Sequence, residues 1–231
     1  ILNLSIDSPL VDDAGVAHLK KLPMESLVLL GCSITDASLG HIASMRGLRE
    51  LHIRNSKGVT GSGLVHLEKL HGLRQLGLNG TTVTDESLPA IGALASLKEL
   101  EIGATRVSDQ GLPALARLIG LNKLNVGYNA ICDPGVSEIA TLTNLEDLDL
   151  KNTHVGNAGL EKLRALTKLQ RLDLHGTEVT DEGLKHLHGL TKLTHLDVTN
   201  TQVTAAGIAE LQGALRGCKV IHDPPPPAAG Q

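Results

Sequence analysis

Acidic residues recur at a fixed interval along the second half of the chain. Asp149, Asp173 and Asp197 are 24 residues apart, and Glu101 lies 48 residues before Asp149. Paired carboxylates can act as a general acid and a general base, but only where burial keeps a proton on one of them. Carboxylates at an open surface instead attract a basic partner and contribute to specificity. The elements that carry these residues decide between the two kinds of chemistry.

Histidines and cysteines could bind a metal ion. The chain has eleven histidines, and four of them occupy the same step of the predicted helices and face outward: His18, His41, His66 and His186. Neighbouring helices are about 10 Å apart, too far for one ion to join two of these side chains. The three cysteines are far apart in the sequence and form neither a C-x-x-C motif nor an even set for disulfides. We therefore expect no metal site, no disulfide framework and no cofactor.

A catalytic nucleophile needs a base within hydrogen-bond reach and a third group that orients the base. His52 and Ser56 lie close together on a predicted strand and its edge, but no glycine turn that could form an oxyanion hole accompanies them. The sequence also contains neither a P-loop nor a G-x-G-x-x-G motif. We therefore predict that the protein is not an enzyme. Only an activity that disappears on mutation of Asp149 or Asp173, with the fold intact, would revive a catalytic role.

Nearly the whole chain is built from one repeating unit. Aligned on the first apolar residue, the units start at Ile1, Met24, Leu48, Leu73, Leu97, Leu121, Leu145, Leu169 and Leu193, in steps of 23 to 25 residues. Apolar residues recur at unit positions 1, 4, 6, 11, 16, 19 and 22. Positions 4 and 6 alternate as in a strand, and positions 16, 19 and 22 lie on one face of a helix. Each unit therefore predicts one short strand, a turn and one helix.

The turn between strand and helix has the pattern T-x-V-T-D-x-G-L. Thr180 is predicted to cap the first helical N–H groups of the eighth unit, and Asp181 to place negative charge at the positive end of the helix dipole. In the seventh unit Gly156 replaces the threonine, so we expect the helix to start at Asn157. Position 9 is threonine in five units, and its hydroxyl is predicted to hydrogen-bond the backbone of the next unit.

The pattern L-x-x-L-x-L-x-x-T-x-V-T-D-x-G-L-x-x-L resembles a leucine-rich repeat, from residue 1 to about residue 217. It is most similar to the 24-residue arrays of many bacterial proteins and to the repeats of F-box receptor proteins. The resemblance implies an α/β fold, a right-handed solenoid of nine repeats with a concave parallel sheet and convex helices. Threonine at position 9 and the short unit depart from ribonuclease-inhibitor-like arrays, so neither ribonuclease inhibition nor GTPase activation is carried over.

We expect one repeat domain over residues 1–222, closed by a last short strand at Val220 and Ile221, and a proline-rich disordered tail at residues 223–231. The chain begins in a strand-like stretch with no cap before Ile1, which suggests a piece of a longer protein. It has no signal-peptide pattern and no apolar run of about 18 residues, so no membrane-spanning segment is predicted. The compartment is left open, with the cytoplasm favoured.

The surface residues of the sheet follow from the repeat. Positions 3, 5, 7 and 8 face the concave side, because positions 4 and 6 face the core. Position 5 is acidic in four of the last five units, and Tyr128, the only aromatic residue, lies at position 8 among glycine and alanine neighbours, where it could anchor a partner. The predicted partner-binding residues are His52, Arg54, Glu99, Glu101, Lys123, Asn125, Tyr128, Asp147, Asp149, Lys151, Arg171, Asp173, His175, His195 and Asp197.

A net charge of −4 and a single aromatic residue argue against a nucleic-acid partner, which needs a basic stripe and stacking faces. We predict a non-catalytic module that binds a protein or peptide on its concave sheet, with a basic surface as the complement to its acidic residues, and no membrane partner. The acidic residues at position 5 could equally be a common sequence pattern of this repeat, with their charge balanced by nearby Lys and Arg. Tyr128 could pack locally over its turn.

Two other functions stay open at this stage. The resemblance to F-box receptors implies the substrate-recognition part of a ubiquitin ligase, for which an F-box before Ile1 would be the discriminating feature. Alternatively, the array is a passive spacer whose partners bind elsewhere.

Overall fold

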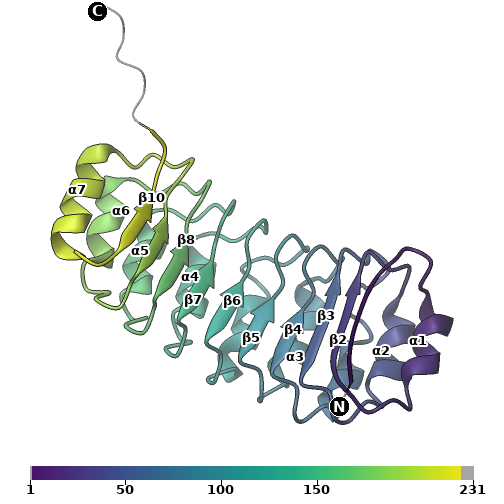
Figure 1. Cartoon of the computed structure of the whole chain (residues 1–231). Helices are drawn as coiled ribbons and strands as arrows, with labels where there is room; N and C mark the ends of the chain where they lie inside the picture. The colour runs from purple at the N-terminus through teal and green to yellow at the C-terminus, as the bar shows by residue number, and fades with distance from the viewer. Residues whose placement is uncertain (1, 225–231) are drawn as a thin grey trace, which may run out of the picture.

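The repeat folds into one curved sheet. The computed structural model describes residues 2–224, within which ten strands lie side by side in chain order, each parallel to its neighbours (Figure 1). The strands are β1 (Leu2–Asp7), β2 (Met24–Leu30), β3 (Glu50–Arg54), β4 (Gln75–Gly77), β5 (Glu99–Glu101), β6 (Lys123–Asn125), β7 (Asp147–Asp149), β8 (Arg171–Asp173), β9 (His195–Asp197) and β10 (Lys219–Ile221).

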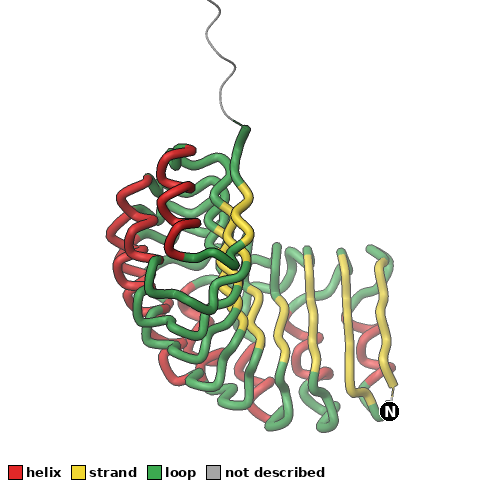
Figure 2. The backbone as a smooth tube through the Cα atoms, turned by 60° about the vertical axis from the view of Figure 1, so that its left-hand side comes forward, coloured by secondary structure: helices red, strands yellow, loops and turns green. Residues whose placement is uncertain are grey.

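Helical segments cover the other side of the sheet (Figure 2). The α-helices are α1 (Asp13–Leu19), α2 (Asp36–Ile42), α3 (Leu88–Gly92), α4 (Asp133–Ile139), α5 (Asn157–Leu163), α6 (Asp181–Leu184) and α7 (Ala205–Ala214), and the 3₁₀ helices are η1 (Leu64–Lys69), η2 (Asp85–Ser87), η3 (Leu112–Arg117) and η4 (Lys185–Leu187). Because all strands run the same way, helix-to-strand connections lie along one lateral edge and strand-to-helix connections along the other. The predicted α/β solenoid is confirmed.

The apolar positions of successive units stack in register. Position-4 leucines form a continuous ladder in which Leu76 pairs with Leu100, Leu100 with Leu124, and so on to Leu196. All of them are buried. Burial of one such side chain contributes about 1.5–3 kcal/mol, and each unit packs only on its neighbours. The core is therefore a column of aliphatic side chains, built without Phe or Trp.

A hydrogen-bonded interlock joins consecutive units at the helix starts. The position-13 carboxylate of one unit accepts from the position-12 backbone N–H of the next: Asp181 Oδ1 from Thr204 at 2.8 Å, and Asp85 Oδ1 from Ser108 at 2.7 Å. The second oxygen accepts from the hydroxyl of the same residue, at 2.6 Å in both pairs. The position-15 glycine leaves room for this carboxylate, because a Cβ on Gly207 would overlap Asp181 Oδ1. Contact between units thus explains the T-D-x-G motif.

The predicted cap at Thr180 is wrong, whereas the helix of the seventh unit starts at Asn157 as predicted. Thr180 makes no side-chain hydrogen bond to its own helix, because its Oγ1 accepts from Asn157 Nδ2 of the preceding unit at 2.9 Å. Asn157 does not cap its own helix, since Gly156 holds the N-cap position and Asn157 Oδ1 accepts from the Thr180 N–H at 3.0 Å. Caps of the predicted kind form at Thr35 and Thr204.

The position-9 hydroxyls also differ from the prediction, because they bond within their own unit. Thr177 Oγ1 donates to the Leu174 carbonyl at 2.6 Å. The same bond to the carbonyl three residues back is made by Thr81, Thr105, Thr153 and Thr201. Thr105 Oγ1 also lies 3.0 Å from Asn129 Oδ1 of the next unit, which is a side-chain and not a backbone contact. Asn129 does reach a neighbouring unit, donating to the Ile102 carbonyl at 2.8 Å.

The position-8 residues that follow β2 to β9 share a left-handed backbone. Their φ angles run from +49° to +73°, at Gly31, Asn55, Gly80, Ala104, Tyr128, Asn152, Gly176 and Asn200. Glycine adopts this conformation freely and asparagine at low cost, whereas other side chains are strained by about 1–2 kcal/mol. Strain is therefore concentrated at Ala104 and Tyr128, in two adjacent units.

The interlock is absent between units three and four. Gly61, with φ of +104°, takes the place of the acidic residue, and Ser87 takes the place of the position-15 glycine. A Cβ on Gly61 would lie 2.5 Å from Ser87 Oγ. The two departures therefore compensate each other sterically.

The end of the array follows the prediction for Val220 and Ile221. Both belong to β10, which pairs with β9 in register. Of the predicted tail, Asp223 and Pro224 are described and residues 225–231 lie outside the described part, so the boundary at residue 222 stays a prediction. In residues 2–224 no helix has the length and apolar character needed to cross a bilayer.

Candidate functional site

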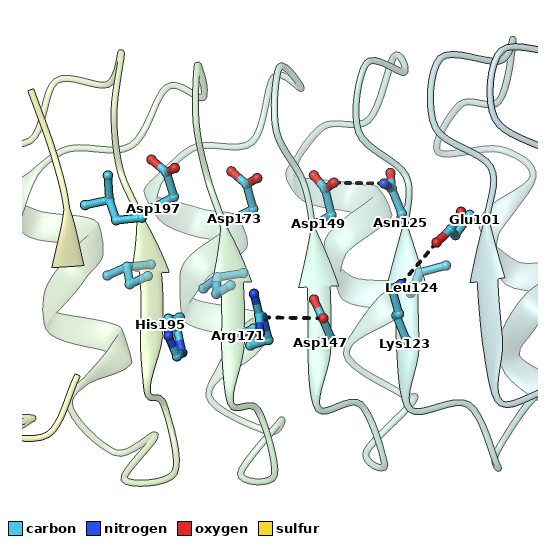
Figure 3. Close-up of a pocket in the computed structure, with 13 residues that line it drawn as sticks. Glu101, Lys123, Leu124, Asn125, Asp147, Asp149, Arg171, Asp173, His195 and Asp197 are labelled. Carbon is cyan, nitrogen blue, oxygen red and sulfur yellow. Dashed lines mark hydrogen bonds and ion pairs between the residues drawn. The ribbon is translucent and has the colours of Figure 1, made fainter. Parts of the chain in front are cut away.

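A hollow of about 330 Å³ lies on the concave face between β5 and β10 (Figure 3). Nine of the fifteen predicted partner-binding residues line it: Glu101, Lys123, Asn125, Asp147, Asp149, Arg171, Asp173, His195 and Asp197. The sequence prediction missed its apolar lining, which includes Ile221, 43% exposed. Ile221 aligns with Asp197 across the β9–β10 pair. One more step of 24 residues beyond Asp197 would have found it.

Each position-5 aspartate of the hollow commits one oxygen to the backbone. The Oδ1 atom accepts from the N–H two residues further on, in the pairs Asp149–Lys151 at 3.0 Å, Asp173–His175 at 3.0 Å and Asp197–Thr199 at 2.9 Å. Asn125 makes the same bond to the Gly127 N–H at 3.0 Å. This N–H lies just beyond the end of the strand, and the side chain satisfies it. The repeated L-D-L pattern is therefore partly explained by this hydrogen bond to the backbone.

The outer oxygens of these aspartates differ from unit to unit. Asp149 Oδ2 accepts from Asn125 Nδ2 at 2.8 Å and from Lys151 Nζ at 3.0 Å. Within the described part of the chain, no donor contacts Oδ2 of Asp173 or Asp197. Burial raises the pKa of Asp173, and the charges of Asp149 and Asp197 raise it further against the hydrogen bond from His175. An external cation would relieve this repulsion.

Position 3 supplies the other side of the hollow. Arg171 Nε lies 3.7 Å from Asp147 Oδ2, and both side chains are partly exposed. Burial raises the pKa of Asp147 in spite of the positive charges of Arg171 and Lys123. The hollow thus carries both signs of charge, with its cations at position 3 and its unpaired carboxylates at position 5.

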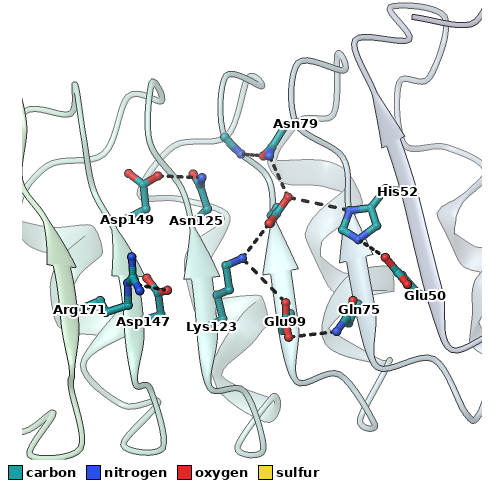
Figure 4. Close-up of polar contacts among 12 residues, drawn as sticks. Glu50, His52, Gln75, Asn79, Glu99, Lys123, Asn125, Asp147, Asp149 and Arg171 are labelled. Atoms are coloured by element: carbon teal, nitrogen blue, oxygen red, sulfur yellow. Dashed lines mark hydrogen bonds and ion pairs between the residues drawn. The ribbon is translucent and has the colours of Figure 1, made fainter. Parts of the chain in front are cut away.

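In the N-terminal half of the concave face, the charged side chains pair with one another around Glu101 (Figure 4). Glu101 Oε2 accepts from Arg54 Nη2 at 2.7 Å and from Asn79 Nδ2 at 3.1 Å, and its Oε1 accepts from Lys123 Nζ at 3.1 Å. Burial would raise the pKa of Glu101, but the hydrogen bond from Lys123 and the charge of Arg54 outweigh burial and lower it. Both oxygens of Glu101 are engaged, so this carboxylate stabilises the sheet surface.

His52 completes this cluster. The His52 residue is 8% exposed, and a Cβ on Gly77 would overlap its ring. Its Nδ1 lies 3.3 Å from Arg54 Nη2 and its Nε2 lies 3.2 Å from Glu50 Oε1. Because Arg54 can only donate, Nδ1 accepts and Nε2 carries the proton. Burial and the charge of Arg54 lower the pKa of His52, which favours this neutral form.

The structure does not join His52 and Ser56 as base and nucleophile. Both nitrogens of His52 are engaged by Glu50 and Arg54, and Ser56 Oγ is buried without a hydrogen-bond partner among the described residues. In the same part of the chain, no group of three or more His, Cys, Asp or Glu side chains could hold a metal ion.

Tyr128 stands apart from both halves. Its residue is 55% exposed, its φ is +58°, and Lys151 Nζ lies 5.8 Å from the centre of its ring. The remaining predicted residues also lie outside the hollow: His175 Nδ1 is 2.7 Å from Thr199 Oγ1, and Glu99 accepts from Gln75 at 3.0 Å. Most of the fifteen residues therefore line the hollow or belong to the ion-paired cluster around Glu101, and Glu101 and Lys123 belong to both.

Comparison with known proteins identifies the repeat. The family described as a leucine-rich repeat region matches residues 24–221. No curated protein sequence matches the chain. Of the solved structures, an internalin (inlF) of Listeria monocytogenes is similar, with a TM-score of 0.64 and 20% identity over 91% of this chain and 71% of its own. Internalin C2 (inlC2) of the same species has a TM-score of 0.57 and 25% identity over 82% of this chain and 84% of its own. With the family match covering most of its length, this chain belongs to the leucine-rich repeat family.

Proposed function

We propose that this chain is a protein interaction module that binds a basic segment of a protein or peptide in the concave hollow. Leucine-rich repeat proteins are generally non-catalytic interaction modules, and the family match and the internalin fold support this class. A sheet that is already rigid loses little entropy on association. The proposal rests on one observation: Oδ2 of Asp173 and of Asp197 face the hollow without a donor in the described structure.

The contrast between the two halves of the face supports the C-terminal half as the binding region. In the N-terminal half, Glu101 already has Arg54 and Lys123 as partners, so a ligand would have to break ion pairs to bind there. In the C-terminal half, a guanidinium or ammonium group between Asp173 and Asp197 would replace repulsion with charge-assisted hydrogen bonds. Ile221 offers an apolar contact at the end of the row.

The test uses the variant Asp173→Asn/Asp197→Asn. Asparagine keeps the Oδ1 acceptor for the backbone N–H, as Asn125 does, so the fold should survive while two charges are lost. The matched control is Glu161→Gln/Glu210→Gln, which removes two charges from exposed helix residues. Fluorescence anisotropy measures binding of a labelled alternating Arg-Ala peptide and of its Glu-Ala counterpart.

The parent and the control should bind the Arg-Ala peptide and not the Glu-Ala peptide, and binding should weaken with salt. The double Asn variant should lose about ten-fold or more in affinity, because each carboxylate contributes a charged hydrogen bond. The proposal would be contradicted if the parent bound the Arg-Ala and Glu-Ala peptides equally, or if the double Asn variant bound the Arg-Ala peptide with unchanged affinity.

The receptor role implied by the F-box resemblance stays a prediction. No contact in residues 2–224 bears on it, because the discriminating feature would be an F-box, which the repeat itself does not contain. An F-box in the same polypeptide would support a substrate-binding role for the concave face in a ubiquitin ligase, whereas a secretion signal would contradict this role.

A further inference from the structure

The two lateral edges of the solenoid carry opposite charge. Nine helix-to-strand connections lie on one edge, at residues 20–23, 43–49, 70–74, 93–98, 118–122, 140–146, 164–170, 188–194 and 215–218. They contain ten Lys or Arg residues, all exposed, and one acidic residue, Glu146. We call these connections the basic edge. The first residues of the strands add three cations and three acids, and Glu25, which aligns with Arg49, adds one more acid, so thirteen cations face five acids.

Local structure explains only part of this charge. Helix C-termini point to the basic edge and favour cations in their last turn. This effect does not extend to Arg74 and Lys98, which directly precede β4 and β5. Arg49 has an acidic partner, Glu25 at 3.0 Å. Others bond neutral acceptors that leave their charge in place, as Lys98 does with the Gly120 carbonyl at 3.2 Å.

The opposite edge carries acidic residues at the helix starts, and several of them are engaged in hydrogen bonds. The position-13 carboxylates, such as Asp85 and Asp181, accept interlock hydrogen bonds from the next unit. The net charge of −4 therefore hides a strong separation of charge across the width of the solenoid. An anionic surface would be attracted to the basic edge and repelled by the other.

Apolar side chains on the basic edge indicate the kind of anionic surface. Leu22 and Ile119 are 40% and 72% exposed within these connections, and no aromatic residue occurs there. Single-stranded nucleic acid is held by stacking on aromatic rings, and in the described residues no helix or hairpin projects from this edge to enter a duplex groove. Aliphatic side chains among cations instead suit a bilayer with anionic head groups.

We propose that the basic edge is a contact surface for anionic phospholipid membranes. Lys and Arg side chains would lie at the head groups, with Leu22 and Ile119 entering the interface. In this orientation the opposite edge points away from the bilayer, and the concave hollow opens sideways, free for a partner. The proposal goes beyond the peptide binding proposed above and does not depend on it.

Co-sedimentation with vesicles tests the proposal. The probes are vesicles of phosphatidylcholine alone and of phosphatidylcholine with phosphatidylserine in a two-to-one ratio, at low and moderate salt. The variant Arg74→Gln/Lys98→Gln/Lys192→Gln removes three charges from the basic edge. The control Lys57→Gln/Arg106→Gln removes two exposed charges from strand-to-helix connections, on the opposite edge. Circular dichroism checks that both variants are folded.

The parent and the control should bind the vesicles with phosphatidylserine and not those without it. Each lost cation should weaken binding by about five-fold, so the triple variant should bind about 100-fold more weakly. Ile119→Ser should weaken the binding that remains at moderate salt. A loss in the control as large as that in the triple variant would overturn the proposal. So would equal binding to both kinds of vesicle, or binding to duplex DNA without binding to phosphatidylserine vesicles.

Discussion

Asp181 and Thr204 belong to consecutive units and are joined by two hydrogen bonds, from the Thr204 N–H at 2.8 Å and from its Oγ1 at 2.6 Å. Gly207 in α7 lies against this carboxylate. We expect Gly207→Ala to lower the free energy of unfolding by about 1–3 kcal/mol, because its Cβ must displace Asp181 Oδ1. Urea denaturation monitored by circular dichroism measures the change.

Gly213→Ala in the same helix is the matched control. No atom lies within 4 Å of a Cβ at this position, so the substitution should raise the free energy of unfolding by about 0.5–1 kcal/mol through helix propensity alone. In an Asp181→Ala background the Gly207→Ala penalty should shrink. A Gly207→Ala protein as stable as the Gly213→Ala protein would contradict the interlock.

The break in the interlock at Gly61 and Ser87 predicts coupling between these two residues. Gly61→Asp alone should destabilise, because its Cβ meets Ser87 and its φ of +104° suits only glycine. Ser87→Gly clears the space for the carboxylate, so the double variant should be more stable than the two single effects predict, by about 1 kcal/mol. A double-mutant cycle in urea measures this coupling, and purely additive effects would show that the two departures are unrelated.

Local rules gave the period of the array but not the contacts between its units. The apolar positions fixed strand, turn and helix, and the ladder from Leu76 to Leu196 follows from the 24-residue step. The T-D-x-G motif was interpreted as a cap within one helix, because capping rules consider residues a few positions apart. Its actual partners lie 23 residues apart in the sequence, as Asp181 and Thr204 do. Such residues become neighbours only in the folded solenoid.

The sequence predicted which face of the sheet carries the candidate site. Unit positions 3 and 5 placed nine of the fifteen residues in the hollow. The division of that face was not predictable, because it depends on side-chain geometry. Arg54 and Lys123 reach Glu101 from two different strands, whereas no side chain among residues 2–224 donates to Asp173 Oδ2. The basic edge was missed because net charge was summed over the whole chain.

The pKa of Asp173 predicts the pH dependence of one substitution. A carboxyl whose pKa is raised on folding makes the folded state lose stability as pH rises through the ordinary value of 3.8 toward the folded value. At pH 7 the charged Asp173 is therefore unfavourable. Asp173→Asn removes the charge and keeps the acceptor for the His175 N–H, so it should be more stable than the parent at pH 7. The gain should fade once the pH falls below 3.8.

Glu101→Gln should behave in the opposite way. The pKa of Glu101 is lowered below 4.5, so its contribution to stability is present above that value and is lost as pH falls through the folded pKa. Glu101→Gln should therefore be less stable than the parent at neutral pH, with a difference that shrinks in acid. Urea denaturation at several pH values measures both variants. If Asp173→Asn and Glu101→Gln changed the free energy of unfolding in the same direction at neutral pH, the contrast between the two halves of the concave face would be contradicted.

Tyr128 allows stability and binding to be separated. Its left-handed backbone, with φ of +58°, is strained for a ring-bearing residue, and the neighbouring Ala104 has φ of +52°. Tyr128→Asn should raise the free energy of unfolding by about 1 kcal/mol, since asparagine tolerates this conformation. Ala104→Gly is the control for relief of strain without loss of a ring. If Tyr128 anchors a partner, Tyr128→Asn should bind the Arg-Ala peptide more weakly although it is more stable, while Ala104→Gly binds normally. Unchanged peptide affinity in Tyr128→Asn would assign the ring to local packing with Lys151.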